Sequence, residues 1–386
     1  MTPAVKSKAL TVGVNVCRLL LAVTFIFSGF VKANDPLGTV YKLEDYVHAM
    51  AWFTLPDTFL LGCAVILAFF EFTLGVYVLF GIKRKATSSI VLAFMVVMTL
   101  LTVYIAIANP VEDCGCFGDV LILSNGATLA KNVVLLGAAV LIRRYYRLQK
   151  NFLGSAAKWL VAFVSLCSII GYAVYCIICL PVLDFRPYKL GTNLRAAVTN
   201  ASGEEKFDVK IVYEKDGETL ELSADDEDPD STWTYVETRR TPIVAQDLAT
   251  ADFYVADADG EDITEDILYA DGYTLLLIIP NLMNADEGCV DKVNALYDYA
   301  YEHDWDFYCL TSSSDEEAQT YWEEHTGAEY GYCIAEERML KTVVRGQPGL
   351  VLLHDGIIVK KWGNYNLPTE EELRNQFPDQ SNNENK

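Results

Sequence analysis

The stretch Thr58–Phe80 reads TFLLGCAVILAFFEFTLGVYVLF and contains one charged residue, Glu71. A helix rises about 1.5 Å per residue, so about 20 apolar residues cross the hydrocarbon core of a bilayer. This run therefore predicts a membrane-spanning helix. Further apolar runs predict four more spans, at Val12–Val31, Ser88–Ala108, Thr128–Ile142 and Trp159–Pro181. The first run is too long for a cleaved secretory signal and is interpreted as a retained anchor.

The apolar residues are concentrated in one half of the chain. The 386 residues carry a net charge of −22, yet the mean hydropathy is +0.20. Residues 1–181 have a charge balance of +6, and the remainder has a balance of −28. This division predicts a membrane half and an acidic soluble half, which excludes a single globular enzyme. It also argues against nucleic-acid binding, because so acidic a domain repels phosphates.

The loops between the predicted spans alternate in charge. Basic residues lie before the first span, after the second and between the fourth and fifth: Lys6, Lys8, Lys83, Arg84, Lys85, Arg143, Arg144, Arg147, Lys150 and Lys158. The other loops are acidic. Basic loops stay in the cytoplasm. The pattern thus predicts a multi-pass protein of the bacterial cytoplasmic (inner) membrane, in contact with membrane lipid, with its N-terminus inside and everything after Pro181 outside.

Two ionisable residues, Arg18 and Glu71, fall within predicted spans. Charges at such depth are costly and are usually paired or functional. One interpretation is an interhelical ion pair that fixes helix packing. The other is a polar wall around a quinone or a proton path, which would make both residues candidates for binding a membrane quinone.

Ten cysteines are present, and four of them form two close pairs. Cys114 and Cys116 lie in an outer loop, whereas Cys176 and Cys179 lie at the outer end of the fifth span. Both pairs are expected near one membrane surface, in a compartment that permits disulfides. A Cys-x-Cys disulfide closes a small, strained ring and is therefore easily reduced. These four cysteines are the candidate redox residues.

Other interpretations of the cysteine pairs stay open. Cys114 and Cys116 could bind a metal, although no histidine or third cysteine lies nearby in sequence. Cys176 and Cys179 could be small apolar residues that fill space in a helix. The carboxylates Glu112, Asp113 and Asp119 should raise the pKa of the loop thiols, which favours a disulfide that is attacked by a partner's thiol, with Cys114 as the candidate for the attacked sulfur.

A family resemblance rests on Arg18, the run Thr24–Lys32, Glu71 and above all Asp113–Asp119 (DCGCFGD). These residues resemble the DoxX-like membrane proteins, specifically the methylamine-utilisation protein MauE branch, over about residues 10–148. The resemblance implies a four-helix membrane bundle, redox-active Cys114 and Cys116, and a role in forming disulfides in an exported protein. Some DoxX relatives are linked to quinone reduction. Methylamine itself is not implied as a substrate.

The acidic half has the element order of a thioredoxin fold. Strands and helices alternate, Asp355-Gly356 marks a hairpin, and Gln347-Pro348 stands where such folds have a cis-proline. Cysteine is absent from Asn281–Gly288, where a Cys-x-x-Cys motif would fall. Cys289, Cys309 and Cys333 have no partner at that spacing, and the lost motif argues against dithiol chemistry in this domain.

The expected architecture is an α-helical membrane bundle, a four-helix core plus a fifth span, followed by a C-terminal extracytoplasmic α/β thioredoxin-like domain. The expected segments are a membrane domain at 1–148, a fifth span at 149–183, a strand-rich polar linker at 184–250, the thioredoxin-like domain at 251–378 and a disordered tail at 379–386. The linker includes an acidic run, Asp225–Asp230, interpreted as a solvated loop.

Two functions remain in competition. The first is a membrane thiol–disulfide or electron-transfer protein that exchanges with a secreted or periplasmic thiol protein, with Cys176 and Cys179 relaying electrons toward a quinone and with no covalently bound cofactor. The second is a non-enzymatic scaffold whose outer domain binds a partner. The cysteine pairs favour the first function, and the missing Cys-x-x-Cys favours the second. Phosphate-binding glycine loops, histidine-rich metal motifs and nucleophile elbows are absent from the sequence, which argues against nucleotide and hydrolase chemistry.

Overall fold

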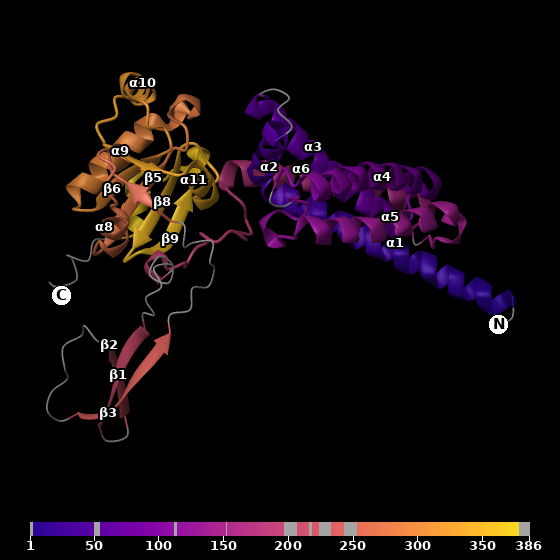
Figure 1. The fold of residues 1–386 in the computed structure, drawn as a ribbon, viewed down its shortest axis with the longest axis horizontal. Coiled ribbons are helices and arrows are strands. Elements are labelled where there is room, and N and C mark those ends of the chain that lie inside the picture. Colours follow the sequence, from indigo (N-terminus) through magenta and orange to yellow (C-terminus); the bar gives the residue numbers. More distant parts are fainter. Residues whose placement is uncertain are drawn as a thin grey trace. The chain divides into compact units, whose positions relative to one another are not determined.

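The computed structural model describes residues 3–49, 55–111, 114–151, 153–196, 207–215, 218–223, 233–242 and 253–377. The chain divides into two compact units, Met1–Phe185 and Arg186–Lys386 (Figure 1). The acidic run Asp225–Asp230, the tail 379–386 and the two carboxylates Glu112 and Asp113 lie outside the described residues.

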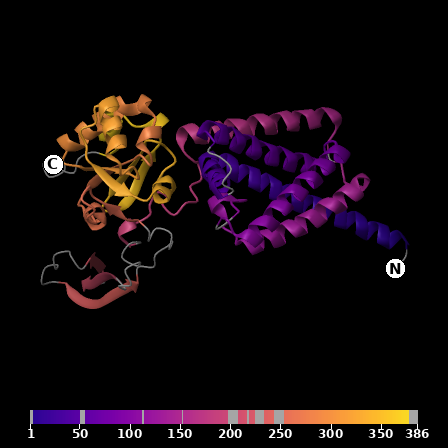
Figure 2. The same cartoon turned by 45° about the horizontal axis from the view of Figure 1, so that its top comes forward.

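Five helices among the described residues of the first unit are long and apolar enough to cross a membrane. They are α1 (Pro3–Asn34), α3 (Asp57–Phe80), α4 (Arg84–Ala108), α5 (Asn125–Arg144) and α6 (Ser155–Cys179). Figures 1 and 2 show them gathered in one bundle. Apolar side chains such as Ile107, 80% exposed, cover its outside, as a bilayer requires. The predicted spans and membrane bundle are confirmed.

Helices α1 and α3 approach closely through two glycines. A Cβ atom on Gly75 would lie 2.6 Å from the backbone nitrogen of Ile26, and one on Gly29 would overlap the backbone of Phe72. Small residues that let two backbones approach are typical of helix packing in membranes. This contact fixes the spacing between the two helices that hold the polar groups described below.

A short helix, α2 (Pro36–Ala49), was not expected from the sequence, which indicates only an acidic loop there. Asp35 caps its first turn, because the backbone N–H of Gly38 donates to Asp35 Oδ1 at 2.8 Å. Pro36 then occupies the first helical position, where its missing N–H costs nothing. Brief 3-10 turns, η1 (Gly118–Val120) and η2 (Tyr146–Leu148), lie on either side of α5.

The basic loops lie at one end of the bundle. Arg84 donates to the carbonyl of Gln149 at 2.6 Å, and Lys83 Nζ lies 5.7 Å from the centre of the Trp159 ring. These contacts join the α3–α4 turn to the α5–α6 connection. Because α4 and α5 each run the length of the bundle, the loop that contains Cys114 and Cys116 lies at the opposite end.

The second unit contains a six-stranded sheet of order β4-β7-β6-β5-β8-β9. The strands are β4 (Val255–Ala256), β5 (Tyr273–Ile278), β6 (Asp306–Thr311), β7 (Tyr332–Ala335), β8 (Gly349–His354) and β9 (Ile357–Trp362). Strands β5, β6 and β7 are parallel, whereas β4, β8 and β9 run antiparallel to their neighbours. The predicted hairpin is confirmed, with Asp355 and Gly356 both at positive φ.

Helices pack on this sheet around a core of buried apolar side chains. They are α8 (Thr264–Tyr269), α9 (Val290–Glu302), α10 (Glu316–Thr326), α11 (Glu337–Val343) and α12 (Glu370–Gln376). Trp322 of α10 is fully buried, and its indole N–H donates to the Tyr330 hydroxyl at 3.1 Å. The Gln347-Pro348 bond is cis. The mixed sheet and its strand order confirm the expected thioredoxin-like domain.

Residues ahead of the predicted domain start at 251 also pack on this sheet. Leu194 is 1% exposed, and its N–H donates to the carbonyl of Gly356 at 2.9 Å. A separate antiparallel sheet of order β2-β1-β3 follows, formed by β1 (Phe207–Lys215), β2 (Glu218–Ser223) and β3 (Thr234–Pro242). The linker 184–250 therefore begins with residues that belong to the α/β unit.

Candidate functional site

The cysteine loop joins α4 to α5 and is closed at its base by two asparagines. Asn125 Nδ2 donates to Asn109 Oδ1 at 2.8 Å and to the carbonyl of Val111 at 2.9 Å. Gly115 has φ +61°, a conformation that favours glycine. A Cβ atom there would also approach Lys42 Cγ to 3.0 Å. The glycine between the cysteines therefore permits a turn tight enough for both sulfurs to meet.

The two sulfurs of this loop face each other. Cys114 Sγ and Cys116 Sγ are 3.0 Å apart, and both residues are thiols. Cys114 is 8% exposed, whereas Cys116 is partly exposed. The two sulfurs predicted to act as a pair therefore lie within hydrogen-bond distance of each other, and their redox role stays a prediction.

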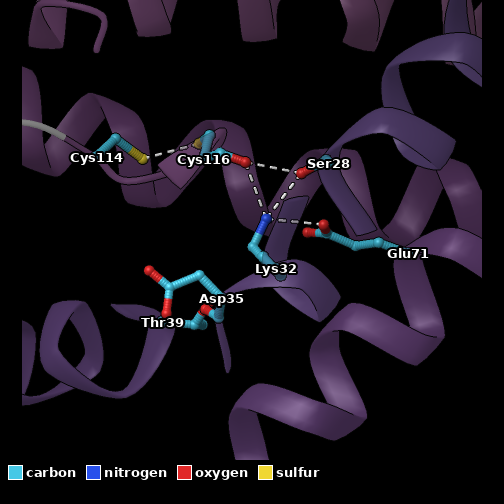
Figure 3. A network of polar contacts seen from close by, with 7 residues as sticks. All are labelled: Ser28, Lys32, Asp35, Thr39, Glu71, Cys114 and Cys116. Atoms are coloured by element: carbon cyan, nitrogen blue, oxygen red, sulfur yellow. Dashed lines mark hydrogen bonds and ion pairs between the residues drawn. The ribbon is translucent and has the colours of Figure 1, made fainter. Parts of the chain in front are cut away.

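A buried ion pair lies against Cys116 (Figure 3). Lys32 Nζ of α1 is 2.8 Å from Glu71 Oε2 of α3, and the two side chains are 8% and 5% exposed. The same ammonium donates to the carbonyl of Cys116 at 2.9 Å and to Ser28 Oγ at 2.7 Å. Ser28 Oγ in turn donates to that carbonyl at 2.8 Å. Two side chains of α1 thus hold one backbone oxygen of the cysteine loop.

Neighbouring side chains fix the rest of the loop. The Tyr46 hydroxyl of α2 donates to the carbonyl of Cys114 at 2.9 Å. The ring of Phe117 lies 5.4 Å from that of Phe27 and has Lys131 Nζ over it at 4.1 Å. Because Ser28 lies six residues, about 9 Å, before the end of α1, the loop reaches into the end of the bundle.

The surroundings change the pKa of the two thiols in opposite directions. The hydrogen bond from Cys114 lowers the pKa of Cys116 to about 6, and the charges of Lys131 and Lys32 act in the same direction against burial and Glu71. The hydrogen bond to Cys116, together with burial, raises the pKa of Cys114. The expectation that nearby carboxylates raise the pKa of both loop thiols is therefore wrong for Cys116, whose described neighbours include two lysines.

Arg18 and Glu71 do not form one site. Arg18 donates to the carbonyls of Lys150 at 2.5 Å and Leu79 at 3.1 Å, at the basic end of the bundle. It lies ten residues, about 15 Å, from Ser28 along α1. Glu71 does form an interhelical ion pair, but its partner is Lys32. The two side chains predicted to line a quinone site are thus apart and bonded to protein groups, and they do not fit a shared quinone site.

Sequence reasoning missed Lys32, because it follows the expected end of the first span at Val31. In the structure α1 continues to Asn34, which places Lys32 on its last turn. The spacing of four between Ser28 and Lys32 puts both on one helix face. That spacing was the available signal, and it lies within the run Thr24–Lys32.

Cys176 and Cys179 lie at the end of α6, as expected. Cys176 is 3% exposed. One turn earlier, the Tyr172 hydroxyl donates to Asn34 Oδ1 at 2.8 Å, and its ring stacks on Phe30 at 5.3 Å. Within the described part of the membrane unit, no hydrogen bond joins Cys176 or Cys179 to the loop cysteines. Their relay role stays a prediction.

The cysteines of the α/β unit are separated from one another. Cys289 precedes α9, is 7% exposed and donates to the carbonyl of Asp286 at 3.3 Å. Cys309 and Cys333 lie on neighbouring strands, but Cys333 is in register with Leu310, so the two side chains point to opposite faces of the sheet. Burial raises the pKa of Cys289 and of Cys333 to about 11.

The described residues contain no group of three or more histidine, cysteine or carboxylate side chains placed to hold a metal ion. The metal interpretation of Cys114 and Cys116 therefore gains no further ligand from these residues. The polar groups near each Sγ atom include the other Sγ atom, the Lys32–Glu71 pair and Lys131. Nearby cations favour a thiolate, which is the reactive form of cysteine.

Comparison with known families places the cysteine loop in a recognised domain. Residues 10–143 match the family model of methylamine utilisation protein MauE. This MauE domain includes Ser28, Lys32, Glu71 and both loop cysteines. Residues 207–245, which contain the separate three-stranded sheet, match a domain of unknown function. The wider DoxX resemblance stays a prediction, and the comparison with curated proteins finds no relative.

Solved structures similar to this chain are thioredoxin-like. The thioredoxin domain of a thiol-disulfide oxidoreductase from Bacteroides vulgatus is 17% identical, with a TM-score of 0.23 over 29% of this chain and 86% of that chain. A candidate protein disulfide isomerase from Bacteroides thetaiotaomicron is 21% identical, with a TM-score of 0.25 over 34% of this chain and 84% of that chain.

Proposed function

We propose that this multi-pass membrane protein carries out thiol–disulfide exchange through Cys114 and Cys116, and that it oxidises thiols of a secreted or periplasmic protein. The observation that carries this proposal is the 3.0 Å contact between the two sulfurs, beside the buried Lys32–Glu71 pair. Two thiols at that separation need only a small movement to form a disulfide. The MauE match over the same residues supports a specialised role for the loop.

The exchange balances without any further reactant. A dithiol of the partner gives two electrons and two protons to the Cys114–Cys116 disulfide, so the partner gains a disulfide and the pair becomes two thiols. A low thiol pKa stabilises the reduced pair at neutral pH and makes the disulfide a better oxidant. The membrane quinone expected from the sequence as final electron acceptor stays a prediction, and no step of this exchange depends on it.

The same proposal places the cysteine loop outside the cytoplasm. Its support is the charge distribution, because the basic loops that contain Lys83–Lys85 and Arg143–Lys150 lie at the opposite end of the bundle. Basic loops remain on the cytoplasmic side. Disulfides persist on the outer side.

A test is differential alkylation in intact cells with a membrane-impermeant charged maleimide, read by mass spectrometry of the peptide that contains both loop cysteines. We expect the peptide to be labelled, and its labelled fraction to rise after a pulse of dithiothreitol and fall after diamide. Cys309, which is fully buried, is the internal control and should stay unlabelled. If the pair is oxidised under every condition, its disulfide is a structural clasp and the proposed exchange is wrong. If the pair is labelled only after cell lysis, the proposed orientation is wrong.

A second candidate function is partner binding by the α/β unit. The observation that favours it is the mixed α/β sheet with no cysteine in Asn281–Gly288. Asp286 fills part of this region, since its N–H donates to the carbonyl of Gln347 at 2.9 Å and its carboxylate accepts from Asn364 at 2.8 Å. This role is compatible with exchange in the membrane unit.

A further inference from the structure

We propose that the Lys32–Glu71 pair positions the cysteine loop so that Cys116, and not Cys114, forms the mixed disulfide with the partner. This inference rests on the proposed function and assigns separate roles to the two sulfurs. Cys116 exchanges with the partner, and Cys114 closes or opens the internal disulfide. It replaces the expectation from sequence that Cys114 is the attacked sulfur.

The first support is the way Cys116 is held. Its carbonyl accepts from both Lys32 Nζ and Ser28 Oγ, at 2.9 and 2.8 Å. Glu71 holds the lysine from the other side at 2.8 Å. These bonds tie Cys116 to α1 and α3, the two helices packed together through Gly29 and Gly75. A residue tied to two closely packed helices keeps its sulfur in place while the bond to Cys114 breaks and forms.

The second support is access. Cys114 is 8% exposed, and the Tyr46 hydroxyl holds its carbonyl at 2.9 Å. Cys116 is partly exposed. A partner sulfur must approach in line with the bond that it breaks, and of the two residues Cys116 is the one that is partly open to solvent. Cys114, the more buried residue as a whole, is assigned as the internal partner.

The third support is charge. Among the described residues, the ionisable groups around Cys116 are Lys32 on α1, Glu71 on α3, Lys131 on α5, and Cys114 beside it, with Tyr46 and Lys42 of α2 along the loop. Lys131 and Lys32 favour a Cys116 thiolate, whereas Glu71 opposes it. The thiolate is the species that attacks and the species that leaves. The two sulfurs are 3.0 Å apart, so the thiol of Cys114 is within hydrogen-bond reach of that thiolate.

These roles define two steps. First, a partner thiolate attacks Cys116 Sγ, the bond between Cys114 and Cys116 breaks, and Cys114 leaves and takes a proton. Second, the other partner thiolate attacks the partner sulfur of the mixed disulfide, and Cys116 leaves as a thiolate beside the lysines. The partner loses two electrons and the cysteine pair gains them. A leaving sulfur of low pKa makes the second step fast.

The test compares two matched single-cysteine variants of the loop in the full-length protein, purified in detergent. Cys114→Ser leaves Cys116 and preserves a hydroxyl donor beside it, whereas Cys116→Ser leaves Cys114. With oxidised glutathione as the probe, we expect Cys114→Ser to form the mixed disulfide at pH 7 at least about tenfold faster, measured as a mass shift on the loop peptide. A faster reaction in Cys116→Ser would overturn the assignment.

The positioning role of Lys32 has its own test in the Cys114→Ser background. Lys32→Met combined with Glu71→Leu removes the ion pair without leaving a buried charge, and Ser28→Ala removes one bond to the Cys116 carbonyl without changing any charge. We expect the ion-pair variant to shift the pH profile of Cys116 alkylation upward, with the rate at pH 6 falling by about twofold or more, the change for half a pKa unit in a thiol whose pKa is about 6. Lys32→Arg keeps the positive charge beside Glu71, so its pH profile should match that of the Cys114→Ser parent.

Matched controls separate the possible outcomes. Lys85→Met removes a lysine at the basic end of the bundle and should leave the profile unchanged. An unchanged profile in the ion-pair variant would overturn the role of Lys32. If Cys114→Ser reacts faster with glutathione but the native pair never changes redox state in cells, the proposed function fails while the division of roles stands. If the native pair cycles but Cys116→Ser reacts faster, the function stands and this inference fails.

Discussion

Cysteines of the membrane unit and of the α/β unit lie in different surroundings. In the membrane unit, Cys114 and Cys116 are 3.0 Å apart, and the hydrogen bond with Cys114, together with lysines from α1 and α5, lowers the pKa of Cys116. In the α/β unit, Cys309 is fully buried, Cys333 points to the other face of the sheet, and burial raises the pKa of both. We therefore expect cysteines of the two units to differ in reactivity.

Fold and candidate chemistry lie in different parts of this chain. The α/β unit has the strand order and the cis-proline of a thioredoxin-like domain, but its cysteines are packed like small apolar residues. The described residues of the membrane unit form no such sheet, yet two of their sulfurs lie beside charged groups. A fold does not by itself define a function, and the proposed site lies in the bundle.

The largest expected effect comes from breaking the buried ion pair on one side only. Lys32→Met leaves the Glu71 carboxylate buried among helices without its cation. Removing one partner of a buried pair costs about 3–5 kcal/mol. We expect the midpoint of thermal unfolding of the detergent-solubilised protein to fall. The near-ultraviolet circular dichroism of the membrane unit measures this midpoint.

The matched control is the double variant Lys32→Met with Glu71→Leu. Replacing both members of a buried pair with apolar groups is often neutral. We therefore expect the double variant to recover most of the lost stability. Equal destabilisation in the single and double variants would show that the pair is not coupled, and that the difference between the two units does not depend on it.

A smaller effect is expected in the alkylation of the two kinds of cysteine. The pKa of Cys116 is about 6 and that of Cys289 about 11. At pH 7 the thiolate fraction of Cys116 is close to one and that of Cys289 is on the order of one in ten thousand. Lower nucleophilicity at low pKa offsets part of this difference.

Iodoacetamide should therefore modify Cys116 at least about tenfold faster than Cys289 at pH 7. The rate at Cys116 should fall as the pH drops through about 6, where its thiolate is protonated, whereas Cys289 should gain reactivity only in strong alkali. Peptide mass spectrometry of the reduced full-length protein measures both rates in one sample. Similar rates at pH 7 would remove the contrast between the two units.

Much of the membrane fold could be predicted from sequence, because apolar length and loop charge are local properties. The pairing of Cys114 with Cys116 was also local, since one glycine separates them. The pairing of Lys32 with Glu71 was not, because the two residues are 39 positions apart and meet only when α1 and α3 pack together. Helix α2 was missed because Glu44 and Asp45, which lie within it, were interpreted as part of an acidic loop.

The α/β unit shows the same limit. Alternating apolar runs and the Asp355-Gly356 turn predicted the strands and the hairpin. The burial of Cys309 and the opposite orientation of Cys333 follow from strand register, which one sequence does not reveal. The start of the unit was placed too late as well, because the contact of Leu194 with Gly356 joins residues more than 150 positions apart.

The smallest expected effect is an absence of activity. Residues 184–378, expressed alone, should be soluble and folded, because the sheet and its helices have their own core around Trp322. We expect this fragment to give no insulin-reductase turnover, since its cysteines are buried and separated. Insulin turbidity with dithiothreitol as the reductant measures the activity, and circular dichroism checks that the fragment is folded.

The matched variant for this fragment is Asp286→Cys, which places a cysteine three residues before Cys289, close to the carbonyl of Gln347 that now accepts from Asp286. If the missing cysteine is what separates this unit from a dithiol catalyst, the variant should gain measurable turnover over the unmodified fragment. Turnover in the unmodified fragment would mean that its buried thiols are reactive, and the contrast between the two units would be lost. No gain in a folded variant would place the cause in the loop Asn281–Gly288 itself, because that loop would then hold the new sulfur away from Cys289.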